Sequence, residues 1–284
     1  MLKQHLLIID PQNDFCDLPT TFRPANPLAD GEQLAPALPV AGAHADMLRL
    51  AALIDTAGAS FDAITITLDS HQRLDIAHPT FWCTGDGDGV APFTQISAND
   101  VATGRYVPRD PAATSRALSY LRELEAKGRY VHMVWPVHCE IGSWGYAVHD
   151  SLRAAYNRWE ERELKIVAKV VKGTNPWTEH YSAIEAEVPL ADDDSTQVNA
   201  ALVAALNDAE HIIVAGEAGS HCVKATTEHL VARLPDGAAR LTLLTDCMSA
   251  VAGFEAQYRD FLADMQARGA RLATSEQIAA ECLA

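Results

Sequence analysis

The chain has 284 residues, 48% of them hydrophobic, with 22 Lys and Arg against 38 Asp and Glu for a formal net charge of −16. This charge repels the phosphates of nucleic acids and anionic membrane surfaces, and no run of residues is apolar for long enough to cross a membrane. We therefore expect a cytoplasmic globular protein whose partner is a small molecule, with no nucleic acid and no membrane.

Apolar runs typical of buried strands alternate with helical patterns along the chain. Strands are expected at residues 5–9, 63–68, 130–134, 165–171, 211–215 and 241–244. Helices are expected at residues 45–57, 111–127, 199–207, 254–268 and from residue 222 onward. Such alternation forms βαβ units, so we predict a single α/β domain with a mostly parallel central sheet and helices on both faces.

Three segments rich in Pro, Gly or Asp interrupt this alternation, at residues 16–44, 83–110 and 185–198. No segment is long enough to link two separate domains, so we interpret all three as loop excursions from one domain spanning residues 1–284. Loops of this length commonly cover a site or form a subunit contact. We expect a homo-oligomer.

The stretch from His211 to Leu230 combines a buried strand, a turn and a helix that begins near Cys222. At a helix start the backbone N–H groups lack partners and the helix dipole favours an anion, which lowers a thiol pKa and supplies donors to a nearby oxyanion. A nucleophilic cysteine is expected in such a place. The alternative is that Cys222 is a small buried hydrophobic residue. Because the six cysteines include no CxxC pair, we expect reduced thiols rather than disulfides or a zinc ribbon.

Chemically active side chains follow five of the expected strands, where the carboxyl ends of a parallel sheet gather ligands. They are Asp10, Asp69, His71, His138, Lys172 and Cys222. Each alone has an ordinary explanation, because an Asp after a strand is commonly a helix cap and a His is commonly a hydrogen-bonded filler. Their joint placement after successive strands favours a catalytic or metal-binding role.

Two kinds of site fit these residues. A hydrolytic cysteine needs a cation beside its sulfur and a carboxylate that accepts and returns protons, which Lys172 and Asp10 could supply. Asp69, His71 and His138 offer a carboxylate and two imidazoles, a ligand set suited to a divalent ion such as zinc.

Five motifs, DPQNDF, TLDSH, WPVHC, VVKGT and AGEAGSHCV, occur in this order. Together they resemble the nicotinamidase branch of the isochorismatase-like cysteine hydrolases, over roughly residues 5–15, 61–82, 130–182 and 210–275. The resemblance implies the Rossmann-type, three-layer isochorismatase-like fold. It also implies a catalytic triad of Asp10, Lys172 and Cys222.

The same resemblance assigns further residues. It implies that Asp69, His71 and His138 hold a divalent metal, zinc or alternatively iron or manganese. The peptide between Glu217 and Ala218 occupies the position of a family cis bond, and the N–H groups of Ala218 and Cys222 form the oxyanion hole. Phe15 and Trp135 match aromatic residues beside the substrate ring.

The chain departs from the pattern of many relatives four residues after His71, where Asp75 replaces a histidine and His78 follows three residues later. Either side chain could contact the metal directly or through water. The chain is also longer than small bacterial nicotinamidases, so the identity of the substrate is open.

The resemblance implies an amidohydrolase that converts a small carboxamide to the acid and ammonia. The substrate that it implies first is nicotinamide, which gives nicotinate. One alternative is a related cysteine hydrolase that acts on another amide or a ureide, of the carbamoyl or ureidoacrylate type. Another is a non-catalytic, metal-dependent binding module on the same fold.

Overall fold

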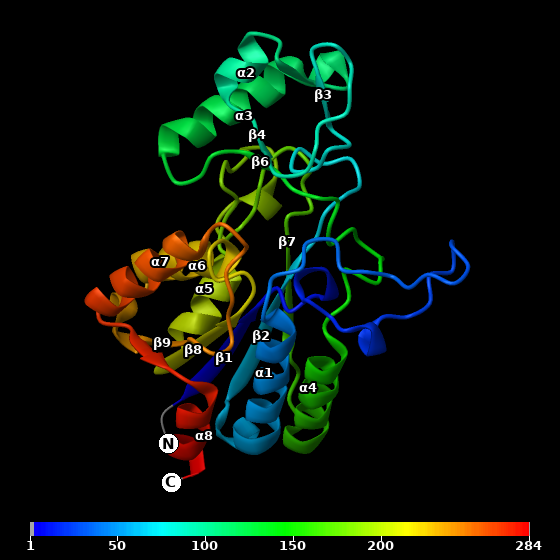
Figure 1. Cartoon of the computed structure of the whole chain (residues 1–284). Coiled ribbons are helices and arrows are strands. Elements are labelled where there is room, and N and C mark those ends of the chain that lie inside the picture. The colour runs from blue at the N-terminus through cyan, green and yellow to red at the C-terminus, as the bar shows by residue number, and fades with distance from the viewer. Residues whose placement is uncertain (1–2, 284) are drawn as a thin grey trace.

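A six-stranded parallel sheet forms the centre of the protein in a computed structural model that describes residues 3–283 (Figure 1). The strand order is β10-β9-β8-β1-β2-β7. The strands cover β1 (Gln4–Ile9), β2 (Ala63–Asp69), β7 (Ala168–Lys172), β8 (His211–Gly216), β9 (Leu241–Leu244) and β10 (Arg271–Ala273). The prediction of an α/β fold with a parallel sheet is confirmed.

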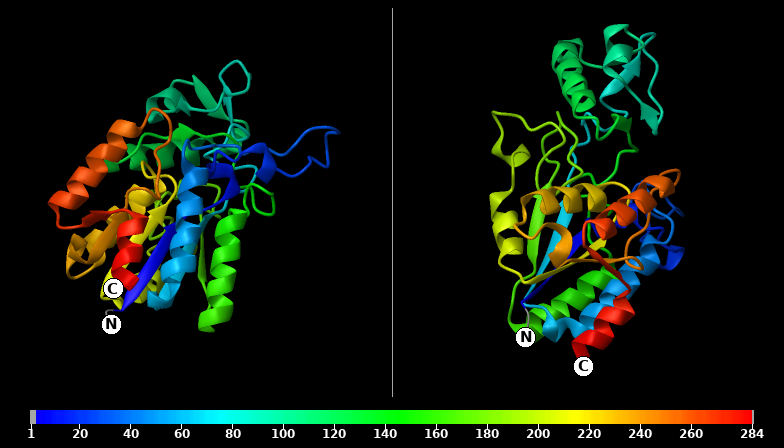
Figure 2. Two further views of the ribbon diagram at one scale, coloured as in Figure 1. Left: turned by 60° about the horizontal axis from the view of Figure 1, so that its bottom comes forward. Right: turned by 90° about the vertical axis from the view of Figure 1, so that its left-hand side faces the viewer.

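Helices cover both faces of the sheet, which gives three layers (Figures 1 and 2). One layer contains α1 (Ala43–Ala57), α4 (Asp150–Glu163) and α8 (Ser275–Leu283), with α1 packed between the other two. The opposite layer contains α5 (Ala200–Asn207), α6 (Cys222–Arg233) and α7 (Glu255–Ala267). Because both faces are covered, the last four residues of β1, Leu6 to Ile9, are apolar and fully buried, as expected for a central parallel strand.

A cap formed mainly by residues 82–127 lies beyond the carboxyl ends of the strands (Figure 1). It contains β3 (Trp82–Thr84), α2 (Ala98–Ala102), β5 (Tyr106–Pro108) and α3 (Thr114–Lys127), and β3 pairs with β5. The short strand β4 (Thr94–Gln95) pairs with β6 (Met133–Val134) at its base. Residues 83–110 thus contain helix and strands of their own.

The expectation that residues 130–134 form a strand of the central sheet is wrong. Only Met133–Val134 are extended, and they pair antiparallel with Thr94–Gln95. The place beside β2 is taken by β7. An apolar run indicates that a segment is buried, but it does not identify the strand with which the segment pairs. Here the partner is β4 in the cap and not a strand of the central sheet.

The sequence analysis also missed α4, α8 and β10. Helix α4 is rich in charged residues, yet Leu152, Ala155, Tyr156 and Trp159 follow the spacing of one helical face and are all buried. Short 3₁₀ turns cover Asn13–Phe15, Thr20–Phe22, Gly58–Ser60, Pro111–Ala113, Asp194–Thr196 and Gly237–Arg240. Within residues 3–283, none of the helices is long and apolar enough to cross a membrane.

Trp159 tests the packing of α4, because its ring is fully buried and its Nε1 donates to the Gly58 carbonyl at 2.8 Å. Trp159→Ala should lower the free energy of unfolding by about 3–5 kcal/mol, the usual cost of removing a large buried ring. Leu28→Ala, at a side chain that is 93% exposed, is the control and should change it by less than about 0.5 kcal/mol. Equal denaturation midpoints for the two variants would contradict the packing.

Candidate active site

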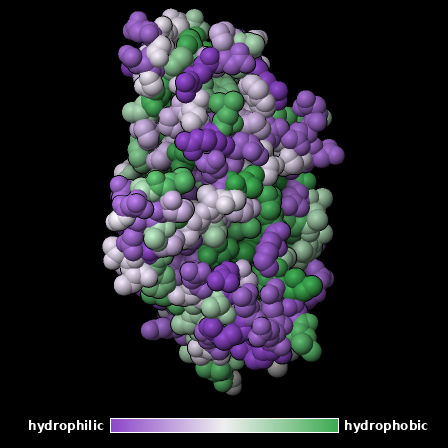
Figure 3. All heavy atoms as spheres, turned by 90° about the vertical axis from the view of Figure 1, so that its right-hand side faces the viewer, coloured by the Kyte–Doolittle hydropathy of each residue, from purple (hydrophilic) through white to green (hydrophobic). Residues whose placement is uncertain are grey.

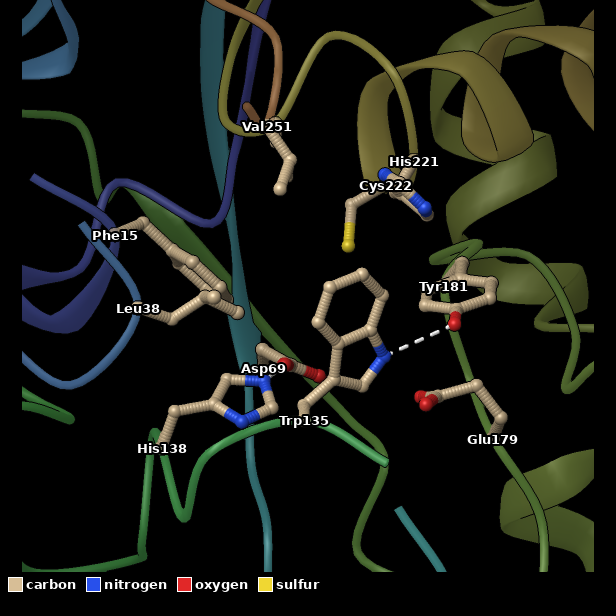
Figure 4. A pocket seen from close by; sticks show the side chains of 11 residues that line it. Phe15, Leu38, Asp69, Trp135, His138, Glu179, Tyr181, His221, Cys222 and Val251 are labelled. Carbon is tan, nitrogen blue, oxygen red and sulfur yellow. Dashed lines mark hydrogen bonds and ion pairs between the residues drawn. The ribbon is translucent and has the colours of Figure 1, made fainter. Parts of the chain in front are cut away.

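A pocket lies where the carboxyl ends of β1, β2 and β7 meet the start of α6 (Figure 4). Its lining residues are Phe15, Leu38, Asp69, Trp135, His138, Glu179, Tyr181, Ala218, His221, Cys222 and Val251. The sulfur of Cys222 points into it from one side and the imidazole of His138 lies on the other. The pocket therefore brings sequence-predicted residues from both proposed sites together.

Lys172, at the end of β7, links these two groups of residues. Its Nζ lies 2.9 Å from Asp10 Oδ2, 2.8 Å from Asp69 Oδ1 and 3.7 Å from Cys222 Sγ, and it donates to the His180 carbonyl at 2.9 Å. Burial alone would lower the pKa of Lys172, but the charges of Asp10 and Asp69 raise it well above its usual range. Lys172 is therefore a fixed cation.

Asp10 follows β1 in a left-handed conformation, with φ of 42°, and its side chain is fully buried. Thr67 holds it in place, since the Thr67 hydroxyl donates to Oδ1 at 2.5 Å and accepts from the Asp10 N–H at 3.0 Å. Burial raises the pKa of Asp10 against the opposing charge of Lys172. A carboxylate with a raised pKa accepts a proton more readily, which suits a general base.

Cys222 is the first residue of α6, as the sequence indicated. The expectation that its pKa is lowered is not met: burial raises the pKa of the thiol well above its usual range, Lys172 opposes this, and Asp10 and Asp69 add to it. Burial, together with the two carboxylates, therefore outweighs the effect of the ammonium on the thiol pKa. The raised pKa favours the neutral thiol form of Cys222 in the folded protein.

The turn between β8 and α6 presents two free donors. The Glu217–Ala218 peptide is cis, as expected. The carbonyl of Ala218 accepts from the N–H groups of His221 and Val223, whereas within residues 3–283 the N–H groups of Ala218 and Cys222 have no acceptor. Gly216 permits the close approach of this turn to β1, because a Cβ there would lie 2.0 Å from the Ile9 carbonyl oxygen. Such a pair of unpaired donors can bind an oxyanion.

Asp69 joins the triad to a buried histidine cluster. Its Oδ2 lies 3.0 Å from His71 Nε2 and 3.3 Å from His138 Nε2, while its Oδ1 binds Lys172. The rear nitrogen of His71 pairs with Asp75 at 3.1 Å, and that of His138 donates to the Pro136 carbonyl at 2.8 Å. Proteins commonly orient metal-ligating histidines in this way, so the residues present fit a divalent ion.

His78 makes a second donor set possible, because one nitrogen each from His71, His78 and His138 lie within 4.8 Å of one another. The two sets differ in whether Asp69 or His78 is the third ligand. His78 turns Nε2 toward Nδ1 of His138, at 3.3 Å, which is not the nitrogen that faces Asp69. Asp75 contacts the Nδ1 atom of His71, and His78 contacts the Nδ1 atom of His138, on the sides of the two rings away from Asp69.

Aromatic rings wall the pocket. Phe15 packs edge-on against His138 with ring centroids 5.5 Å apart, and Trp135 donates from Nε1 to the Tyr181 hydroxyl at 3.0 Å (Figure 4). Both aromatic residues that the resemblance assigned to the substrate thus line the pocket.

Several lining residues were missed by the sequence analysis, among them Glu179 and Tyr181. Glu179 is buried, burial raises its pKa, and its Oε2 has no hydrogen-bond partner within residues 3–283. The segment after Lys172 carries no helical or strand periodicity, so only its nearness in sequence to Lys172 could have indicated this position.

Comparisons with known proteins find structural neighbours only. No family model matches the chain, and no curated protein matches it. A nicotinamidase and pyrazinamidase from Acinetobacter baumanii is 18% identical, with a TM-score of 0.59 over 98% of this chain and 99% of that one. The yeast nicotinamidase Pnc1p is 18% identical, with a TM-score of 0.61 over 95% and 99%.

A third neighbour is the pyrazinamidase of Pyrococcus horikoshii, whose structure was solved in complex with zinc. It is 16% identical, with a TM-score of 0.51 over 96% of this chain and 99% of that one. At such identities the likeness shows the fold alone, and that fold is isochorismatase-like.

The chemistry of Lys172 can be tested through the reactivity of Cys222. Lys172→Met removes the ammonium 3.7 Å from the sulfur, an interaction that at intermediate dielectric is worth about 1–4 kcal/mol, or about one to three pKa units. At a fixed pH near 8, alkylation of Cys222 by iodoacetamide should therefore slow by about tenfold or more, measured by peptide mass spectrometry on folded protein.

Lys169→Met is the matched control, because Lys169 lies on the same strand with a side chain that is 43% exposed. Its alkylation rate should equal that of the wild type. Unchanged alkylation in Lys172→Met would show that the ammonium does not act on the sulfur.

Proposed function

We propose that this chain is a cysteine amidohydrolase that hydrolyses a small carboxamide, with nicotinamide as the substrate that the site favours. The observation that carries the proposal is the position of Lys172 Nζ, 2.9 Å from Asp10 and 3.7 Å from the Cys222 sulfur, beside two unpaired backbone donors. A nucleophile, a base, a cation and an oxyanion site therefore converge on one pocket.

In the proposed reaction, Asp10 removes the proton from Cys222 as the sulfur attacks the amide carbonyl. The N–H groups of Ala218 and Cys222 bind the oxyanion that forms. Collapse of the intermediate transfers the proton from Asp10 to the departing nitrogen and releases ammonia, which leaves a thioester on Cys222. Asp10 then activates a water molecule, whose attack releases the acid and restores the thiol.

Lys172 and Thr67 support these proton transfers. The ammonium stabilises the sulfur while it carries charge and keeps Asp10 ionised until the proton arrives. The Thr67 hydroxyl fixes the other oxygen of Asp10, so that Oδ2 stays directed toward the ammonium. Neither residue needs to move during the reaction.

The histidine cluster supports a substrate with a ring nitrogen. Asp69, His71 and His138 would hold a divalent ion, zinc or alternatively iron or manganese, which when bound supplies a Lewis-acidic point for a ring nitrogen. Phe15 and Trp135 lie where they can contact the faces of a flat ring. The neighbouring folds named above include nicotinamidases and pyrazinamidases, whose substrates combine such a ring with a carboxamide.

Ammonia release from a panel of pyridine carboxamides, pyrazinamide and ureides tests this function. The wild type should release ammonia from nicotinamide, and Cys222→Ala should reduce kcat by at least about 10⁴-fold, because the nucleophile is lost. Cys247→Ala, at another buried cysteine outside the pocket, should retain activity. Substantial turnover by folded Cys222→Ala would show that another residue is the nucleophile. Preferential turnover of ureides would favour the alternative of a related cysteine hydrolase that acts on ureides.

Elemental analysis tests the metal ligands. The wild type should hold about one divalent ion per chain, and His71→Ala should lose most of it and raise KM for nicotinamide. His132→Ala, at a buried histidine outside the cluster, is the control and should keep the ion. Because imidazole must be neutral to bind a metal, the content should also fall below about pH 6. Equal metal content in wild type and His71→Ala would contradict the assignment.

A further inference from the structure

Two acidic side chains are buried together behind the turn that carries Ala218. Glu217, the residue before Ala218, is fully buried, and Asp46 on α1 is 2% exposed. Nothing in the proposed chemistry uses either carboxyl group. Burying a carboxyl group costs free energy unless it is paired or hydrogen-bonded, so the partners of this pair indicate what it does.

Ser249, in the loop after β9, connects the two acids to the turn. Its N–H donates to Glu217 Oε2 at 3.2 Å, and its hydroxyl donates to Asp46 Oδ2 at 2.6 Å. Its carbonyl accepts from the Gly219 N–H at 2.7 Å, and the Glu217 N–H donates to the Ile9 carbonyl at 2.8 Å. Ala218 is therefore held on both sides, through Glu217 and through Gly219.

The charges around the pair require a proton. Arg49 donates to Asp46 and supplies the neutralising charge for one carboxylate. Within residues 3–283, Glu217 Oε1 has no ordinary hydrogen-bond partner. Two ionised carboxylates cannot hydrogen-bond, whereas a protonated Glu217 can donate to Asp46 and still accept from Ser249.

The other groups around Glu217 do not replace this proton. Those near Glu217 and Asp46 are Cys16 and Asp17 from the N-terminal segment, Arg49 from α1, Cys247 from the loop after β9, and Tyr258 from α7. Only Arg49 among them is a cation, and it already binds Asp46. Burial, and then the charge of Asp46 and its hydrogen bond, raise the pKa of Glu217 well above its usual range.

We propose that Glu217 is a positioning residue for the oxyanion-binding turn: its protonated carboxyl group bridges Asp46 and Ser249 and thereby fixes the N–H group of Ala218. Loss of this proton at alkaline pH places two carboxylates against each other and loosens the turn, which sets the alkaline limit of activity. The effect on the alkaline limit of activity rests on the proposed amide hydrolysis. The hydrogen-bonded bridge from Glu217 to Asp46 and Ser249 does not depend on it.

The bridge has a defined effect on stability. A glutamate that titrates near 4.5 when unfolded and at higher pH when folded holds more protons in the folded state. Its contribution is complete below about pH 4.5 and is lost as the pH rises through the folded pKa. Glu217→Gln keeps a donor for Asp46 and an acceptor for Ser249 at every pH. Its folding stability should therefore not fall with rising pH on account of residue 217.

The test compares the pH dependence of kcat in wild type, Glu217→Gln and Glu217→Ala. Glu217→Gln should keep kcat near that of wild type at pH 7 and move the alkaline limb upward by about one pH unit or more. Glu217→Ala should lower kcat about tenfold or more with little change in KM, as part of the 10²–10³-fold cost of a lost oxyanion donor. An unshifted alkaline limb in Glu217→Gln, or wild-type kcat in Glu217→Ala, would overturn the proposal.

Glu187→Gln is the matched control, because Glu187 is also buried, with its pKa raised to about 7 by burial, but lies beside Arg129 away from the turn. Its alkaline limb should match that of wild type, and a shift as large as that of Glu217→Gln would overturn the specific role of Glu217. Should Glu217→Gln not fold, Asp46→Asn serves instead, since an amide at position 46 donates to an ionised Glu217 and should likewise move the limb upward.

Thermal unfolding without substrate separates this inference from the proposed function. The Tm of wild type should fall more between pH 6 and pH 9 than the Tm of Glu217→Gln. If wild type releases no ammonia from any amide, the proposed function fails, while this difference in Tm still supports the protonated bridge. Parallel Tm curves for the two proteins would overturn the bridge whether or not the enzyme is active.

Discussion

The buried ammonium of Lys172 is the interaction on which the site depends. It is in contact with two carboxylates and lies within 3.7 Å of a sulfur, in a place where none of these charges could be buried alone. Asp10 and the Cys222 sulfur both lie beside this ammonium, and Asp69 reaches His71 and His138 with its second oxygen. One cation thus holds the proposed nucleophile, the proposed base and the proposed metal cluster in a single network.

The parallel sheet makes this network possible. The carboxyl ends of β1, β2 and β7 lie on the same edge, so Asp10, Asp69 and Lys172 meet although they are distant in sequence. β8 leads into the turn and the helix start that present the free donors beside Cys222. This much could be predicted from the sequence, because buried strands, the helix start and the residues that follow them are local signals.

The remaining features depend on contacts between distant segments. Residues 130–134 are apolar enough for a central strand, yet they pair with Thr94–Gln95 in the cap. The sequence suggested a lowered thiol pKa at Cys222, but burial and two nearby carboxylates raise it. Glu179 enters the pocket from an irregular segment, and Glu217 meets an acid on α1. No local pattern reports which charges become neighbours after folding.

The central claim is that Cys222 forms a covalent thioester with the acyl group of a carboxamide. The most direct measurement is acid-quenched mass spectrometry of the enzyme during turnover of nicotinamide, followed by peptide mapping. The account predicts a nicotinoyl group on the peptide that contains Cys222, present during turnover and absent after the substrate is consumed. Continued ammonia release with no acyl group on Cys222 at any time, or with the acyl group on another residue, would contradict it.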